Sequence, residues 1–159
     1  MKVQVDIQTA SSEPVPADAD IRNWIEAALA GRTAQEAVEV SVRLVDGDEM
    51  ARLNETYRGK QGATNVLSFP ADLPPELEIP LLGDIVICAP VVRSEAAQQG
   101  KSETAHWAHM TIHGTLHLLG YDHIDEEDAA IMESLESAIL NQLHYSCPYT
   151  TTLPSERSS

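Results

Sequence analysis

Four segments of the chain have the hydrophobic pattern of β-strands. Apolar residues alternate with polar ones over residues 2–8 and 38–45, which is typical of strands with one buried face. Residues 64–69 predict a short third strand that ends at Pro70. The apolar run 83–89 suits a fourth strand that is buried on both faces. The pattern therefore predicts a sheet of about four strands.

Helical periodicity appears between and after these strands, where apolar residues recur every three or four positions. Five helices are predicted. The first begins after a cap at Asp18 or Asp20, and the second follows the turn at Asp46-Gly47. The third and fourth cover residues 90–99 and 103–119, and the fifth begins after Asp125. In the second of them, Met50, Leu53 and Tyr57 are expected to face inward. Ser102 is expected to cap the fourth helix and Gly120 to close it.

The order of these elements, β-α-β-α-β-β-α-α-α, indicates one layered domain of the α/β or α+β class. A length of 159 residues suits a single domain, and no repeat or linker divides the chain. We assign residues 1–150 to this domain and residues 151–159 to a flexible tail. No apolar run is long enough to span a bilayer and no signal-peptide pattern is present, so we expect a cytoplasmic protein.

The charge of the chain narrows the choice of partners. The formal net charge is −15, from 10 basic and 25 acidic residues, which argues against a broad surface for nucleic acid. The segment 50–70 is an exception, because it contains Arg52, Arg58 and Lys60 against a single acidic residue, Glu55. An anionic substrate is therefore expected to bind near this segment or through a metal ion.

The clearest candidate chemistry is a row of histidines. Four of them follow one another in the predicted helix 103–119 at spacings of three, four and four residues: His106, His109, His113 and His117. At about 100° per residue they span an arc of roughly 80°, so they form one stripe. Histidines at i and i+4, such as His113 and His117, can both reach one ion. Gly120 then permits a left-handed turn that can bring His123 to the same ion.

Three histidine ligands leave a fourth position for water or substrate, as in catalytic zinc sites, where zinc lowers the pKa of bound water toward 7. We therefore predict one zinc ion per chain, held by His113, His117 and His123, although imidazoles also suit nickel and other divalent ions. A structural metal is the alternative. It would need a fourth ligand, which His106 or His109 could provide in principle. We expect these two instead behind the ligands or facing solvent.

The spacing HxxxHxxGxxH is also that of the metzincin proteases, which carry a glutamate directly after the first histidine as general base. This chain has Gly114 at that position, and a glycine side chain accepts no proton. The motif thus predicts the metal platform without the peptidase base. Asp122 has two open interpretations, as the partner of a ligand histidine or as a turn residue.

The motif from His113 to His123 resembles the signature of the YbeY family of bacterial single-strand-specific endoribonucleases. Two further blocks resemble that family and follow in its order, TYRGK and TNVLSFP within 56–70 and LGDIVIC over 82–88. The resemblance implies a mixed four-stranded sheet with about five or six helices and a zinc site on a central helix, held by His113, His117 and His123. It also implies that Arg58 is the functionally important arginine.

The function implied by the resemblance is cleavage of single-stranded RNA, in maturation of the 3′ end of 16S rRNA and in ribosome quality control. The implied partners are the ribosomal small subunit or the 70S particle, a small-subunit ribosomal protein and the Era GTPase. We expect Arg58 to face the zinc cleft and clamp the RNA backbone, with Lys60 assisting. Family members vary between Asp and Asn at position 65, and because this chain has Asn65 we expect no catalytic carboxylate there.

Two other functions stay open at this point. The metzincin-like spacing is compatible with a metal-dependent hydrolase of a peptide or small molecule, although Gly114 weighs against it. The strongly acidic composition is compatible with a zinc-stabilised ribosome-assembly factor that has no chemistry of its own, because an acidic protein holds bare RNA weakly at physiological salt.

Overall fold

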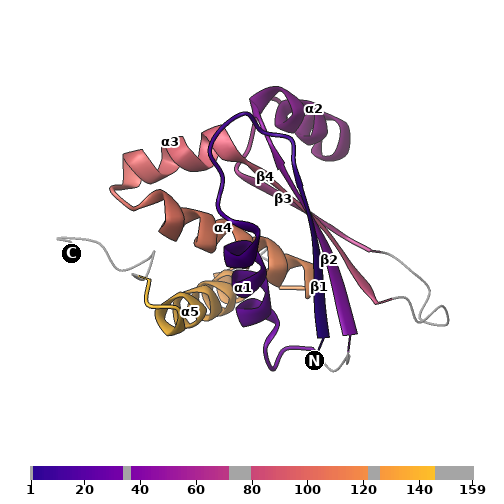
Figure 1. The fold of residues 1–159 in the computed structure, drawn as a ribbon, viewed down its shortest axis with the longest axis vertical. Helices are drawn as coiled ribbons and strands as arrows, with labels where there is room; N and C mark the ends of the chain where they lie inside the picture. The colour runs from indigo at the N-terminus through magenta and orange to yellow at the C-terminus, as the bar shows by residue number, and fades with distance from the viewer. Residues whose placement is uncertain (1, 34–36, 72–79, 122–125, 146–159) are drawn as a thin grey trace.

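The computed structural model describes residues 2–33, 37–71, 80–121 and 126–145. A mixed β-sheet lies between the helices of the molecule (Figure 1). Within these residues the sheet has four strands, in the order β1 (Lys2–Thr9), β2 (Ala37–Val45), β4 (Leu81–Cys88) and β3 (Val66–Pro70). β1 and β4 pair with β2 in parallel, whereas β3 pairs with β4 antiparallel. This confirms the predicted mixed four-stranded sheet and places β3 at one edge.

Five helices in the described part of the chain surround this sheet: α1 (Asp18–Leu29), α2 (Gly47–Arg58), α3 (Ala89–Gln99), α4 (Glu103–Leu118) and α5 (Glu126–Gln142). Figure 1 shows α1, α4 and α5 on one side of the sheet and α2 on the other. α4 contacts β3 and β4 directly and also contacts α1, α3 and α5, so it is the central helix of a single α/β domain, as predicted. Of the described helices, none is both long and apolar enough to cross a membrane.

Burial along the strands follows this layering. On β2, every second residue from Val38 to Leu44 is at most 1% exposed, because one face of that strand packs under α1 and α4. On β4, four consecutive residues from Ile85 to Cys88 are buried, because α2 and α3 cover the second face there. The prediction of a strand buried on both faces is therefore confirmed for this part of β4, whereas Asp84 just before it is exposed.

Two helix ends follow the predicted chemistry and one does not. The hydroxyl of Ser102 accepts a hydrogen bond from the backbone N–H of Ala105 at 3.1 Å, which confirms it as the cap of α4. The helix closes before Gly120, whose φ of +104° suits glycine.

The cap predicted for α1 is wrong. Ala17 holds the cap position, while Asp18 and Asp20 lie in the first turn, where carboxylates interact favourably with the helix dipole. Two further predictions, the cap at Asp125 and the tail 151–159, lie outside the described residues.

The expectation that Tyr57 faces inward is also wrong. Met50 and Leu53 do face inward, as predicted. Met50 is fully buried, and Leu53 packs against the smaller of the two hydrophobic clusters, which lies between α2 and the sheet. The side chain of Tyr57 is 65% exposed and contacts Phe69 of β3 edge-on, with ring centroids 5.3 Å apart. The last turn of α2 thus lies beyond the hydrophobic cluster that buries its first turns.

Candidate active-site groove

A groove of about 940 Å³ runs along the edge strand β3, between the end of α2 and the last turns of α4. His113 and His117 line it from α4, Arg58 lines it from the end of α2, and residues 64–70 form its β3 side. The structure therefore brings together three of the four residues predicted for the site. The fourth, His123, lies outside the described residues, as does Asp122.

The histidine stripe on α4 is as predicted, with each ring next to the following one. Successive ring centroids lie 5.9, 6.4 and 4.7 Å apart from His106 to His117. His106 and His109 are only 2% and 7% exposed, so the expectation that they could face solvent is wrong. They lie in the interior behind His113, where polar groups need hydrogen-bond partners.

Glu136 of α5 is the principal partner of this stripe. Its carboxylate is fully buried and lies 2.5 Å from Nδ1 of His113 and 3.0 Å from Nε2 of His109. Burial raises the pKa of Glu136, but the hydrogen bonds from His109 and His113 outweigh it and hold the pKa below its ordinary value. An ionised carboxylate can only accept, so His113 donates from Nδ1, and its neutral form then carries the lone pair on Nε2, where it can bind a metal.

Lys101 extends this arrangement away from the groove. Its ammonium group lies 3.0 Å from Nδ1 of His106 and 3.4 Å from Nδ1 of His109. Because an ammonium can only donate, both rings accept at Nδ1 and donate from Nε2, to Glu95 at 2.8 Å and to Glu136. Burial lowers the pKa of His106, which favours its neutral imidazole, and burial also lowers the pKa of Lys101. One lysine and two carboxylates thus set the tautomers of both buried histidines.

The same chain of hydrogen bonds ends at Asn65, on the wall of the groove. Its side-chain N–H₂ donates to Glu95 at 3.1 Å, while its side-chain oxygen accepts from the backbone N–H of Val66 at 2.7 Å. An aspartate at this position would place its carboxylate against that of Glu95, where like charges repel. The amide therefore suits this network, consistent with the prediction that position 65 supplies no catalytic carboxylate.

At Gly114, α4 packs tightly against the sheet. A Cβ at this position would lie 2.9 Å from Cγ2 of Ile85, 3.2 Å from Oγ of Ser68 and 3.3 Å from Cγ2 of Val66. The Ser68 hydroxyl also donates to the carbonyl of Gly114 at 3.0 Å. Position 114 therefore faces the sheet and not the groove, which gives a packing reason for the glycine that occupies the place of the metzincin base.

Replacing Gly114 by alanine is expected to destabilise the fold by about 1–3 kcal/mol, because the β-branched Ile85 cannot move away freely and overpacking has this cost. Urea unfolding measures the change. The matched control is Gly47→Ala at the start of α2, where an added Cβ meets nothing within 4 Å. Equal stability of the two variants would contradict the close contact between α4 and the sheet.

Arg58 is held at the groove by the end of α2. Gly59 follows it with φ +66° and donates to the carbonyls of the last turn, and the side chain of Asn54 ties the following loop by donating to the Gly62 carbonyl at 2.9 Å. The Arg58 side chain is exposed and forms no ion pair with any described residue. Among the described residues that line the groove, Arg58 is the one with a guanidinium, and it is positioned to meet an anion there. Arg43 lies outside this lining and is paired with Glu49.

The donor set of the groove fits a metal that prefers imidazole. The rings of His113 and His117 are the closest pair of the stripe, with centroids 4.7 Å apart, and both line the groove. Over residues 2–33, 37–71, 80–121 and 126–145, no group of three or more His, Cys, Asp or Glu side chains is arranged to hold a metal ion. A complete three-ligand site therefore depends on a donor outside these residues, the place where the sequence motif puts His123.

This fold and groove define a single-domain α/β protein whose central helix lines a cleft with two histidines. A family model described as "Endoribonuclease YbeY" matches residues 4–144, so the chain belongs to the YbeY family. Proteins named "Endoribonuclease YbeY" from Cellvibrio japonicus and Pseudomonas syringae pv. tomato are each 57% identical to it, over 149 and 148 residues. These alignments cover 93% and 92% of this chain and 84% and 88% of the two relatives.

A solved structure supports the fold. The solution structure of the protein TM1509 from Thermotoga maritima superposes with a TM-score of 0.59, covering 89% of this chain and 92% of that one. Because the two sequences are only 23% identical, this similarity shows the shared fold alone.

Proposed function

We propose that this chain is a zinc-dependent endoribonuclease that cleaves single-stranded RNA in the groove beside β3. Zinc would be held by His113, His117 and His123, and Arg58 would bind the phosphate at the cleavage site. One observation carries this proposal: His113, His117 and Arg58 line the same groove. Arg58 forms no ion pair with any described residue. Relatives more than 50% identical are named as endoribonucleases, which supports RNA as the substrate.

Each group in or behind the groove has a separate role in the proposed reaction. A guanidinium is always charged and grips a phosphate with two parallel hydrogen bonds, so Arg58 binds and orients the phosphodiester. Zinc, when bound, supplies Lewis acidity toward a phosphoryl oxygen or water. Glu136 holds His113 in the tautomer that can ligate, and Gly114 keeps α4 close to the sheet that forms the other wall. Neither Gly114 nor Asn65 supplies a carboxylate as general base.

The cellular role that we propose is maturation of the 3′ end of 16S rRNA and ribosome quality control in the cytoplasm. A net charge of −15 disfavours tight binding to bare RNA at physiological salt. Recruitment by a ribosomal partner would overcome this, and the partners proposed are the small subunit or the 70S particle, a small-subunit ribosomal protein and the Era GTPase.

Purified, nuclease-free protein tests the proposal on single-stranded RNA and on casein, each with and without a chelator. We expect one zinc per chain, cleavage of RNA that stops on addition of the chelator, and no cleavage of casein. His117→Ala and His123→Ala are expected to lose both zinc and RNA cleavage.

Other outcomes separate the alternatives. Hydrolysis of casein would identify a metal-dependent peptidase. A chain that carries zinc but leaves RNA intact, even with ribosomal particles present, would be an assembly factor. RNA cleavage that survives in His117→Ala would come from a contaminating nuclease.

A further inference from the structure

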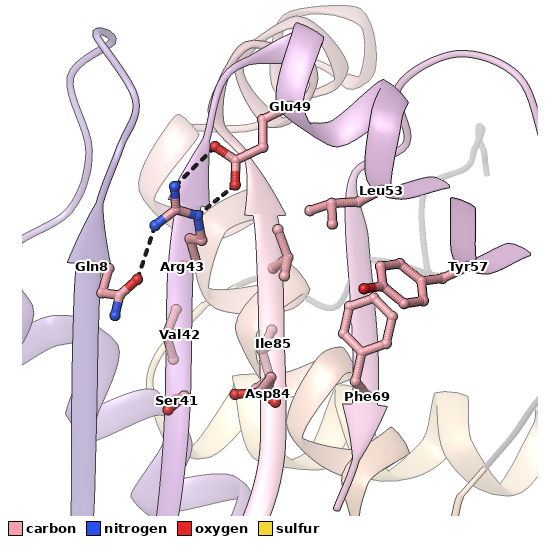
Figure 2. A pocket seen from close by; sticks show the side chains of 11 residues that line it. Gln8, Ser41, Val42, Arg43, Glu49, Leu53, Tyr57, Phe69, Asp84 and Ile85 are labelled. Carbon is pink, nitrogen blue, oxygen red and sulfur yellow. Dashed lines mark hydrogen bonds and ion pairs between the residues drawn. The ribbon is translucent and has the colours of Figure 1, made fainter. Parts of the chain in front are cut away.

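A second cavity, of about 420 Å³, lies on the opposite face of the sheet beneath α2. Figure 2 shows Tyr57 and Phe69 together at one end of it and the side chains of Arg43 and Glu49 near the other. Its size falls in the range of about 300–1,000 Å³ that is usual for ligand pockets. Tyr57 and Phe69 also line the groove described above, so the two cavities meet at this aromatic pair.

Tyr57 has the properties of a stacking surface. It is one of two large apolar side chains in the described residues that are strongly exposed, the other being Ile131 of α5 at 47%. The ring of Phe69 meets it edge-on, with an interplanar angle of 68°, and thereby supports it in position. Exposed aromatic rings that are held in place are the usual partners of unpaired bases in single-stranded RNA.

The polar groups of the second cavity disfavour phosphate. The guanidinium of Arg43 is engaged by three hydrogen bonds, from Nε and Nη2 to Glu49 at 2.5 and 3.0 Å and from Nη1 to Gln8 at 2.9 Å. Asp84 adds a carboxylate to the lining, and the described residues of this lining include no second lysine or arginine. The cavity therefore suits an uncharged ring with hydrogen-bonding edges, whereas the Arg58 guanidinium on the groove side suits the phosphate.

Tyr57 and Arg58 are consecutive residues at the end of α2, so the surface for a base and the surface for a phosphate adjoin. We propose that Tyr57, supported by Phe69, stacks on a nucleobase next to the phosphate bound by Arg58. The RNA strand would cross the edge strand β3, and this base would enter the cavity beneath α2. The inference rests on the proposed function, because it takes RNA in the groove as its starting point.

Binding of a fluorescein-labelled ten-nucleotide single-stranded RNA to the protein as purified tests the inference. It is measured by anisotropy at low salt and in the cold, with a gel after each titration to confirm that the RNA is whole. Tyr57→Ala is expected to weaken binding at least about fivefold, the lower range for loss of one stacked base. Tyr57→Phe keeps the ring and is expected to bind as the wild type does. Ile131→Ala removes an exposed apolar side chain on α5 and is the matched control for nonspecific loss.

A second RNA with 2-aminopurine in place of one base at each position in turn reports stacking directly. In the wild type, fluorescence of one or two positions is expected to be quenched on binding, and Tyr57→Ala is expected to lose that quenching. Unchanged affinity and quenching in Tyr57→Ala would overturn the inference. Equal loss in Tyr57→Phe would overturn it too, because the hydroxyl and not the ring face would then be responsible.

One result would contradict the inference alone, and a different result would contradict the proposed function on which it rests. If Tyr57→Ala binds RNA normally but no longer co-sediments with ribosomal small subunits, the cavity takes a protein and the inference is wrong. If nuclease-free wild-type protein leaves single-stranded RNA intact, with zinc and ribosomal particles present, the proposed function itself is wrong, whatever Tyr57→Ala shows about binding.

Discussion

Replacing Arg58 by alanine is expected to lower RNA cleavage about 100- to 1,000-fold while zinc content and folding stay unchanged. Loss of one positioned group that stabilises developing charge has an effect of this size. The Arg58 side chain is exposed in the groove and forms no ion pair with a described residue, so the fold does not depend on it. Steady-state cleavage of single-stranded RNA and a zinc determination on the same sample measure the two quantities.

The control for Arg58→Ala is Arg52→Ala, which removes the same charge from an exposed position on the same helix but outside the lining of the groove. Arg52→Ala is expected to keep near-normal activity. Arg58→Lys keeps the charge without the planar fork and is expected to fall between wild type and alanine. Equal losses in the Arg52 and Arg58 variants would attribute the effect to net charge, and normal cleavage by Arg58→Ala would refute its role.

Much of the fold could be predicted because its signals are local. The alternation in β2 and the continuous apolar run in β4 report how many faces of each strand are covered, and both are confirmed. The spacing from His106 to His117 placed four rings on one stripe, because helical geometry alone determines which residues share a face. The placement of Arg58 at the histidine groove was expected from the family resemblance together with the locally basic segment 50–70.

The groups around the histidines could not be predicted in the same way, because they come from other elements. Glu136 lies 23 residues after His113, and Lys101 and Glu95 precede the helix, so their contacts depend on how α3 and α5 pack against α4. One signal was available: Glu136 shares the inward face of α5 with Met132 and Ile139, both fully buried. A single carboxylate on an apolar helix face indicates a buried partner.

The exposure of Tyr57 shows the limit of a periodic pattern. Its spacing from Met50 and Leu53 is that of one helix face, but the hydrophobic cluster beneath α2 ends before the last turn. Periodicity reports which residues share a face and does not report where the surface that covers this face ends. The sequence pattern therefore predicted a core position for Tyr57, whereas the structure places its ring on the surface.

Replacing Glu136 by glutamine is expected to weaken zinc binding about 10- to 100-fold, the usual effect of removing a partner that orients a ligand histidine. The carboxylate accepts one hydrogen bond from His113 and one from His109. An amide of the same shape has one accepting oxygen and one donating nitrogen, so one of the two histidines then faces a donor. If that ring is His113, its lone pair moves to Nδ1 and its Nε2 becomes protonated and unable to ligate.

Competition with a chromophoric chelator near neutral pH measures the zinc affinity, and nitrogen-15 spectra of the histidine rings in metal-free protein measure the tautomers. In the wild type we expect the proton of His113 on Nδ1, and in Glu136→Gln a changed tautomer for His113 or His109. Glu133→Gln, three residues earlier on α5, is the matched control and is expected to change neither quantity.

The two measurements separate an orienting role from a structural one. Glu136 is fully buried, so its replacement is also expected to lower the free energy of unfolding, since a buried hydrogen-bond acceptor is lost. A lower unfolding free energy with unchanged zinc affinity and unchanged tautomers would mean that Glu136 only holds α5 against α4. Because zinc binds the neutral ring through its lone pair, a change in the His113 tautomer must appear as a change in zinc affinity if this histidine is a ligand.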